Sequence, residues 1–538
     1  MRNLFTSFLV LFFFSSVCLL AQTDYSLEWE RTSATSVGYA MVRNSVDGSI
    51  VRTGAASGSL GNEVFCLRYS EEGELLSDFH FINIYGAWGA WMNGVLNDEE
   101  GNFYYIITAT ASVYVSGEEP TQGTFLFIIK TSPEGELIWE KTYTKDDEYF
   151  AQAFSAVFKD HHLYLSGSVA QYEGDNNVHY DETFAVKMDT SGAVVWETFI
   201  PETSRAFALD VRQDTVVFLC RKLVKKDYLL TYLNEADGAS MASYAFQNSD
   251  IYADIHYTDT FGNHYFLQDG GPDFAYKIKK YAPDGDSLWT YVKEHSEPDA
   301  YRDRAKQLAF DSENNIYCIG TSLHLPAMET RLLLTKLDQD GNVLWETERE
   351  GHIERAGFFS KTFLVAGDRI LIGAYSFTED SDVKNFLLLE YDSSGQFLQE
   401  IAYPNSDPTE DDFPGDMLLG DDGSLYVSGI AVEGGQPHAV LLKYGVSVSV
   451  EVLAGGLEDL YFFPNPTAGF CRIEGEDAAE VSEVVVYDAL GQRVQAFSLN
   501  GVQDVIELDV SALPPACYCL SLKSAGGRFR VFKMVKVE

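Results

Sequence analysis

The 538-residue chain carries 81 acidic and 38 basic residues, which gives a formal net charge of −43 at pH 7. This charge disfavours nucleic acids and anionic membranes as partners, because phosphate groups attract Lys and Arg. The chain is too long for one ordinary core, so we expect repeats or several domains. With 36 Phe and 31 Tyr against 8 Met, the composition favours the half-buried pleated surfaces of an all-β protein.

The N-terminus has the three parts of a secretory signal peptide. Arg2 is followed by an apolar stretch over residues 9–20, and the small residue Ala21 ends the pattern. We therefore expect residues 1–21 to be removed by cleavage after Ala21. A lipidated Cys18 is the alternative, although its neighbours fit a lipoprotein signal poorly. No second stretch of the sequence is long and apolar enough to span a bilayer.

Apart from Cys18, the cysteines are scattered through the chain rather than grouped. Their spacing resembles neither a disulfide framework nor paired metal sites. We therefore expect most of them to be small core residues. They are Cys66, Cys220, Cys318, Cys471, Cys517 and Cys519.

One phrase recurs along the chain: an alternating hydrophobic run, a Gly turn, and then an apolar pair with Trp and an acidic residue. Clear copies occupy residues 130–140, 187–197, 281–289 and 336–346, and weaker copies occupy residues 69–76, 233–241 and 391–398. The copies are roughly 45–60 residues apart, which is the range of propeller and kelch repeats. A second phrase, a β-branched or aromatic strand ending in Gly, precedes copies of the first, as in residues 163–167 and 316–320.

These patterns predict about four short antiparallel strands in each unit, the content of one propeller blade. Eight units are predicted, starting near residues 36, 87, 148, 204, 249, 301, 353 and 409. The eighth unit lacks its last strand, whereas residues 25–32 match residues 135–142 although they precede the first unit. We therefore predict that residues 22–445 form an eight-bladed β-propeller closed by an N-terminal strand. Residues 25–444 resemble exported propeller-repeat proteins, which implies a fold and leaves the activity open.

A different pattern follows the linker at residues 446–459. Residues 460–538 contain several short motifs in a fixed order, ahead of a Lys-rich last strand. The motif residues are Pro464, Asn465, Pro466, Gly469, Tyr487, Asp488, Gly491 and Tyr518. This order resembles the type A sorting domain of type IX secretion cargo. One departure is Ala516-Cys517, where that family has a Gly before the Tyr.

The resemblance implies a small Ig-like β-sandwich that the outer-membrane type IX secretion machinery recognises and usually removes. It also implies a protein that passes through the periplasm of a Gram-negative cell. The protein is then secreted or attached to the outer cell surface. A plain structural β-sandwich is the alternative for residues 460–538.

Motifs for common enzymes are missing from the sequence. It contains no Gly-x-Ser-x-Gly, no His-Glu-x-x-His and no Walker loop, so we predict no cofactor and favour binding over catalysis. The pair His161-His162 and acidic turns such as residues 338–342 are interpreted as hairpin turns rather than metal sites. Calcium binding by the acidic loops stays open.

The runs before the first strand of each unit differ from unit to unit and mix aromatic residues with Arg. Such side chains suit sugar or peptide recognition, because rings stack and charged groups form hydrogen bonds. We expect an extracellular glycan or protein ligand at one mouth of the ring. The candidate residues are Trp88, Trp91, Tyr149, Tyr252, Tyr301, Arg302 and Arg304.

Two alternatives remain for this mouth. Aromatic residues such as Trp88, Phe150 and Phe207 fill the space between blades in the first. In the second, the protein is a polysaccharide hydrolase or lyase, and carboxylates at the mouth act as acid and base. The candidate carboxylates are Asp254, Asp303 and Glu354.

Overall fold

The computed structural model describes most of the chain after the expected signal peptide. The described residues are 22–34, 36–58, 61–81, 89–113, 121–145, 149–172, 178–224, 227–246, 255–268, 276–293, 300–327, 329–350, 362–377, 383–403, 410–449, 457, 460–487, 493–499, 505–524 and 529–537. The expected signal peptide, residues 1–21, lies outside them. The chain forms two compact units. The large unit contains residues 27–445. The C-terminal unit contains the described residues from 446 onward, together with residues 22–26.

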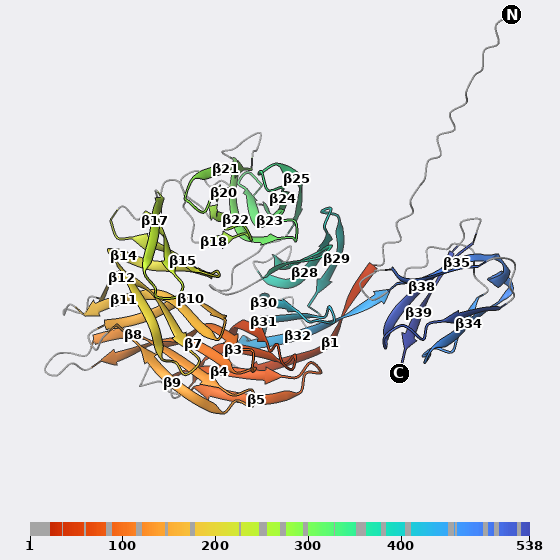
Figure 1. Cartoon of the computed structure of the whole chain (residues 1–538), viewed down its shortest axis with the longest axis horizontal. Coiled ribbons are helices and arrows are strands. Elements are labelled where there is room, and N and C mark those ends of the chain that lie inside the picture. Colours follow the sequence, from red (N-terminus) through yellow and green to blue (C-terminus); the bar gives the residue numbers. More distant parts are fainter. Residues whose placement is uncertain are drawn as a thin grey trace, which may run out of the picture. The chain divides into compact units, whose positions relative to one another are not determined.

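The described part of the large unit consists of four-stranded sheets, which we number in chain order (Figure 1). Sheet 1 contains β2 (Ser36–Arg43), β3 (Ile50–Gly58), β4 (Gly61–Tyr69) and β5 (Leu75–Phe81). Sheet 2 contains β6 (Gly89–Asn97), β7 (Phe103–Val113), β8 (Thr121–Thr131) and β9 (Leu137–Tyr143). Sheet 3 contains β10 (Tyr149–Lys159), β11 (His162–Tyr172), β12 (Val178–Asp189) and β13 (Val194–Pro201).

The next sheets have the same order of neighbouring strands. Sheet 4 contains β14 (Thr203–Val211), β15 (Thr215–Lys222), β16 (Tyr228–Asn234) and β17 (Ser240–Phe246). Sheet 5 contains β18 (Ile255–Thr258), β19 (His264–Gln268), β20 (Lys277–Tyr281) and β21 (Ser287–Val292). Sheet 6 contains β22 (Tyr301–Phe310), β23 (Ile316–His324), β24 (Glu329–Leu337) and β25 (Val343–Glu350). Sheet 7 contains β26 (Phe363–Ala366), β27 (Arg369–Phe377), β28 (Lys384–Asp392) and β29 (Phe397–Ala402).

Sheet 8 takes its strands from both ends of the large unit. It contains β30 (Phe413–Leu419), β31 (Leu425–Glu433) and β32 (Gln436–Ser449), and the N-terminal strand β1 (Gln22–Ala34) pairs with β32. The first strand of each sheet contacts the first strand of the next, and β30 of sheet 8 contacts β2 of sheet 1. The contacts between first strands therefore run from sheet 1 to sheet 8 and back to sheet 1.

Polar bonds connect sheet 8 to sheet 1 as well. The Asp416 carboxylate on β30 accepts the main-chain N–H of Met41 on β2 at 2.9 Å. Arg52 on β3 is fully buried and donates to the Ser33 hydroxyl on β1 at 2.6 Å. Because Ser33 belongs to β1, the N-terminal strand takes part directly in this interface.

A tryptophan on the last strand of several sheets contacts a turn of the following sheet. Its indole N–H donates to a main-chain carbonyl between the third and fourth strands of that sheet. The pairs are Trp29 with Glu71 (3.0 Å), Trp139 with Thr190 (3.0 Å), Trp196 with Glu235 (2.8 Å), Trp289 with Gln339 (3.0 Å) and Trp345 with Ser393 (3.1 Å). Trp29 on β1 thus repeats the contact that the internal tryptophans make.

Each of these turns contains a glycine under the indole ring. Gly73 has a φ of 84°, and a Cβ placed there would lie 2.8 Å from Cδ2 of Trp29. Only glycine avoids both the strained backbone and the steric clash. The Gly turn and the Trp that recur in the sequence are therefore the two sides of one contact between neighbouring sheets.

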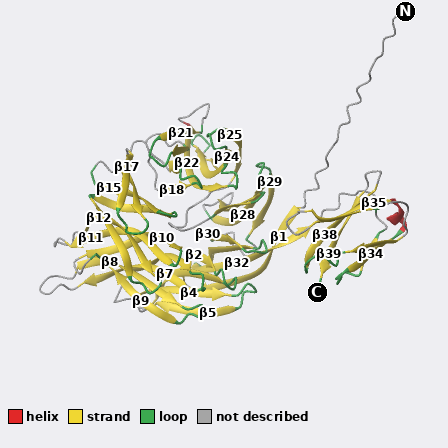
Figure 2. Cartoon of the chain, viewed as in Figure 1, coloured by secondary structure: helices red, strands yellow, loops and turns green. Residues whose placement is uncertain are grey.

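The C-terminal unit consists of two sheets around one core. One contains β33 (Tyr461–Phe463), β34 (Phe470–Glu474) and β37 (Val505–Asp509). The other has the order β36 (Arg493–Ser498), β35 (Val481–Tyr487), β38 (Ala516–Ser524) and β39 (Phe529–Lys536). Buried Ile473, Leu508, Val484 and Leu520 belong to their common hydrophobic cluster. Strands dominate the described chain, and the 3-10 helix η3 (Glu476–Glu480) lies in this unit (Figure 2).

The expected all-β class is confirmed, and most unit starts lie close to a first strand. The starts expected near residues 87, 148, 249, 353 and 409 fall outside the described residues. The first strands that follow them begin at Gly89, Tyr149, Ile255, Phe363 and Phe413. The cysteines described as buried are Cys66, Cys220, Cys318 and Cys471.

We predict that Trp29→Ala lowers the free energy of unfolding by about 2 kcal/mol, because it removes a partly buried indole and its hydrogen bond. Chemical denaturation followed by circular dichroism measures this change. Trp345→Ala is the matched control, since Trp345 makes the same contact between internal sheets. A much smaller loss for Trp29→Ala than for Trp345→Ala would contradict a structural role for β1. Deletion of residues 22–33 removes most of the strand and is expected to destabilise the unit further.

Candidate functional site

The structure describes five of the seven residues predicted to bind a ligand. Trp91 lies in β6, Tyr149 begins β10, and the others lie in β22. Trp88 and Tyr252 lie outside the described residues, as do the candidate carboxylates Asp254 and Glu354. The residues on β22 are Tyr301, Arg302 and Arg304.

Successive side chains of β22 point to opposite faces of sheet 6. The Tyr301 ring lies 4.9 Å from the ring of His324, its cross-strand neighbour on β23. Arg302 is half-buried and donates to the main-chain oxygen of Tyr301 at 2.8 Å, while Arg304 is exposed. Asp303 is buried and accepts a hydrogen bond from the Ser322 hydroxyl at 2.5 Å. The Asp303 carboxylate is therefore buried within the large unit, whereas the Arg304 side chain faces solvent.

The first strands of sheets 1, 2, 3, 4, 6 and 8 carry β-bulges at similar places. A bulge adds a residue to one strand and turns that residue out of the regular ladder. The shifts lie between Gly38 and Ala40 in β2, Met92 and Gly94 in β6, Ala153 and Ser155 in β10, Ala206 and Ala208 in β14, Ala305 and Gln307 in β22, and Pro414 and Met417 in β30.

Two bulge residues hold an arginine between them. Phe154 of β10 and Phe207 of β14 occupy the extra positions, and the Arg205 guanidinium carbon lies 5.1 Å from each ring centroid. All three side chains are half-buried. The two rings orient the guanidinium, whose Nε is buried. The sheet 3 to sheet 4 interface thus contains an aromatic and cationic cluster, which we call the Phe–Arg–Phe cluster.

Phe154 is a candidate site residue that the sequence pattern does not indicate. Packing between blades is one of the alternatives that the sequence leaves open for Phe207, and Arg205 is not among the residues predicted to bind a ligand. The sequence signal is one extra residue that interrupts the alternation of inward and outward side chains in β10 and in β14. Its meaning depends on the register with β11 and β15, which a local pattern does not fix.

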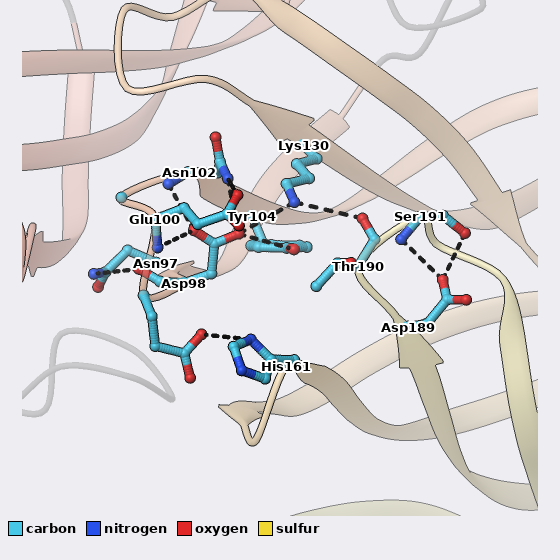
Figure 3. A network of polar contacts seen from close by, with 12 residues as sticks. Asn97, Asp98, Glu100, Asn102, Tyr104, Lys130, His161, Asp189, Thr190 and Ser191 are labelled. Atoms are coloured by element: carbon cyan, nitrogen blue, oxygen red, sulfur yellow. Dashed lines mark hydrogen bonds and ion pairs between the residues drawn. The ribbon is translucent and has the colours of Figure 1, made fainter.

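Acidic turns between the first and second strands bind groups of their own chain (Figure 3). Asp98 Oδ1 accepts the N–H groups of Glu100 (3.1 Å) and Asn102 (2.8 Å), and Oδ2 accepts the Tyr104 hydroxyl at 3.2 Å. Lys130 Nζ lies 3.1 Å from Asp98 Oδ2. Burial alone would raise the pKa of Asp98, but hydrogen bonds from Asn102 and Lys130 lower it overall. The carboxylate therefore stays ionised with its oxygens already engaged.

Lys130 connects this turn to the next sheet. It is buried, lies 4.9 Å from the Tyr104 ring centroid, and reaches the main-chain oxygen of Thr190 at 3.4 Å. Similar sets combine Asp259, Tyr265 and Lys280, or Asp311, Tyr317 and Lys336. In the described residues no group of three His, Cys, Asp or Glu side chains is arranged to hold a metal ion. These acidic turns are thus interface elements.

Asp160 and His161 occupy the turn between β10 and β11 with positive φ values of 48° and 60°. His161 Nδ1 lies 3.2 Å from Glu99 Oε2 (Figure 3). His162 Nδ1 lies 2.6 Å from the main-chain oxygen of Asp160. The two histidines contact different partners: His161 lies in the hairpin turn, and His162 begins β11.

A chain of polar groups lies where sheet 5 meets sheet 4, with His264 buried and Tyr232 and His256 half-buried. His264 Nε2 contacts the Tyr232 hydroxyl, and His264 Nδ1 lies 2.9 Å from His256 Nε2. Burial and then the nearby Arg212 charge lower the pKa of His264 to about 4, and burial lowers that of His256 as well. Both imidazoles are therefore neutral in the folded protein at pH 7.

Acid is predicted to destabilise the large unit through this pair. The unfolded histidine titrates near 6.5, whereas folded His264 titrates near 4, so unfolding takes up a proton between these values. Stability is complete above pH 6.5 and falls as the pH drops toward 4. From pH 7 to 5 we expect a loss of about 2 kcal/mol from His264. Denaturation curves across this range measure it, and His264→Gln should flatten the dependence while His161→Gln leaves it unchanged.

Retention of the full pH dependence in His264→Gln would show that other groups cause it. The window above pH 5 separates the histidines from the carboxylates, because Asp98 and Asp311 have lowered pKa values and protonate only in stronger acid.

The C-terminal unit brings several predicted motif residues to one end of its two sheets. Gly469 accepts the N–H of Val510 at 2.7 Å, and the buried Tyr518 donates its hydroxyl to the main-chain oxygen of Pro514 at 2.8 Å. Tyr487 ends β35, and the segment Pro464–Pro466 follows β33. Asp488 and Gly491 lie outside the described residues.

Residues 461–536 match the family described as the secretion system C-terminal sorting domain. They are a type IX sorting domain. The resemblance seen in the sequence is confirmed, and the domain implies export to the cell surface or into the surroundings. A comparison with curated proteins found no match. Of the described residues, none belong to a helix long and apolar enough to cross a membrane.

Solved structures similar to the chain are distant. The extracellular domain of a hybrid two-component system from B. thetaiotaomicron has 9% identity and a TM-score of 0.30, covering 95% of this chain and 76% of that one. An acylaminoacyl peptidase from Pyrococcus horikoshii has 11% identity and a TM-score of 0.36, covering 73% and 57%. Drosophila Plexin A in complex with Semaphorin 1b has 8% identity and a TM-score of 0.35, covering 78% and 88%.

A chain ending at residue 450 is predicted to fold its large unit and to remain in the periplasm, because it lacks the sorting domain. Cell fractionation with detection of the chain in the medium measures this. The full-length chain is the control. Normal amounts of the shortened chain outside the cell would contradict a sorting role for residues 461–536.

Proposed function

We propose that the protein is type IX cargo whose large unit is a closed eight-bladed β-propeller that binds an extracellular glycan or protein. The unbroken series of contacts between first strands supports the closed ring, as does β1 pairing in sheet 8. The sorting domain supports a location outside the cell for this function. The two parts have separate roles, one in export and one in binding.

The Phe–Arg–Phe cluster is the observation that carries the binding proposal. A guanidinium between two rings is oriented before a ligand arrives, so less freedom is lost on binding. Ring faces suit sugar or aromatic side chains, and the guanidinium suits hydroxyl or carboxylate groups. Because the three side chains are half-buried, they retain surface for a partner. Tyr301, Arg302 and Arg304 add similar chemistry on β22.

Catalysis is the less favoured function. Asp303 is buried and bonded to Ser322, which favours a structural carboxylate over an acid or base that meets substrate. Glycoside hydrolysis needs a second carboxylate at a defined distance, and the other two candidates, Asp254 and Glu354, lie outside the described residues. Binding therefore remains the proposal.

The test is a glycan and peptide binding screen on residues 22–538. We expect a ligand whose affinity falls about tenfold, or about 1.4 kcal/mol, in Phe154→Ala and in Arg304→Ala. Trp88→Ala and Tyr301→Ala test the other predicted residues. Circular dichroism verifies that each variant is folded.

Leu288→Ala is the matched control, because Leu288 is an exposed apolar residue on the last strand of sheet 5. Its affinity should equal that of the parent. If Phe154→Ala, Tyr301→Ala and Arg304→Ala all bind like the parent, the ligand site lies elsewhere and the proposal fails.

A further inference from the structure

The last strand of the sorting domain is held along both edges. On one edge β39 pairs with β38 in antiparallel register. On the other, Thr467 forms a parallel bridge with Lys536. The Thr467 N–H donates to the main-chain oxygen of Val535 at 2.8 Å, and the Val537 N–H donates to that of Thr467 at 2.9 Å. A short segment after β33 therefore acts as a partial strand beside β39.

Asn465 extends this partial strand with its side chain. Its Nδ2 donates to the main-chain oxygen of Lys533 at 2.7 Å, and its Oδ1 accepts the main-chain N–H of Val535 at 2.8 Å. Pro464 and Pro466 have no N–H to offer to a strand edge. A side-chain amide carries both a donor and an acceptor, so it replaces the missing peptide group.

The geometry explains the residue type at position 465. An Asp keeps the shape and the acceptor but loses the donor, and its charge faces the Lys533 carbonyl oxygen. Ala loses both bonds. The segment 465–467 satisfies four main-chain groups between Lys533 and Val537, which would otherwise form an open edge at the end of the chain.

These bonds are not what folds the domain. They join exposed atoms, and such bonds contribute little to overall stability. The domain core lies between the sheets, with Val484, Leu508 and Leu520 fully buried. Loss of the Asn465 amide is therefore expected to loosen the end of β39 and leave the core intact.

We propose that Asn465 is a positioning residue for export: it fixes β39 along its outer edge, and the secretion machinery recognises the strand in this fixed position. The segment β39 carries Arg530, Lys533 and Lys536, so a change in its position moves a basic part of an otherwise acidic protein. The inference rests on the sorting domain and is independent of any ligand of the large unit.

The experiment follows the full-length chain in a bacterium with a type IX system. Asn465→Asp and Asn465→Ala are expected to lower the fraction in the medium at least fivefold and to accumulate the chain in the periplasm. Gln495→Glu is the matched control, because the Gln495 amide donates to the main-chain oxygen of Asp509 at 2.9 Å without touching β39. The control should be exported like the parent.

Hydrogen exchange of the purified chains separates positioning from folding. Faster exchange confined to the end of β39, with parental protection in β35 and β38, supports the proposal when export falls. Parental export of both Asn465 variants would overturn it. Lost protection throughout the domain would also overturn it, since Asn465 would then be needed for folding rather than for positioning.

Discussion

The large unit depends on one repeated contact, a Trp indole that lies on the glycine turn of the next sheet. The indole supplies buried apolar area and one hydrogen bond, and the turn supplies a carbonyl and a surface without a Cβ. Where the tryptophan is replaced, the glycine persists. Gly285 has a φ of 85° and lies under Tyr244, and a Cβ placed on this glycine would lie 2.9 Å from Cγ of the tyrosine ring. The turn geometry thus demands glycine even where the indole is absent.

Buried lysines add a second set of contacts between the same sheets. Lys130, Lys187 and Lys280 are each more than nine-tenths buried in a protein with a net charge of −43. A buried charge is costly unless it is paired, and each lies beside a carboxylate and a tyrosine ring. Lys280 also donates to the main-chain oxygen of Gln339, in the acidic turn of residues 338–342. The carboxylates beside these lysines belong to other hairpin turns. Their charge stabilises the interfaces between sheets and is directed inward.

The Phe–Arg–Phe cluster and the sorting domain lie in different parts of the chain and depend on different structural features. The Phe–Arg–Phe cluster relies on β-bulges that turn side chains out of a regular ladder. The sorting domain relies on a side-chain amide that completes the edge of its last strand. The bulges and the side-chain amide both interrupt regular β-structure, and the regular sheets around them fix their positions.

The sequence by itself determined the local structure and the order of the parts. Alternating residues and Gly turns specify strands and hairpins, because both depend on neighbours in the chain. The match of Trp29 to the internal tryptophans indicated that an N-terminal strand belongs with the last sheet. The ordered motifs after residue 460 identified the sorting domain, because a family pattern needs no coordinates.

Tertiary structure alone decided which distant side chains meet. Phe154 of sheet 3 contacts Arg205 of the neighbouring sheet 4. Asn465 forms a hydrogen bond with Lys533, which lies 68 positions away in the chain. These contacts depend on strand register and on single-residue bulges, and a shift of one residue reverses the direction of every following side chain. Local patterns tolerate either register. The packing of whole sheets against one another selects one of them.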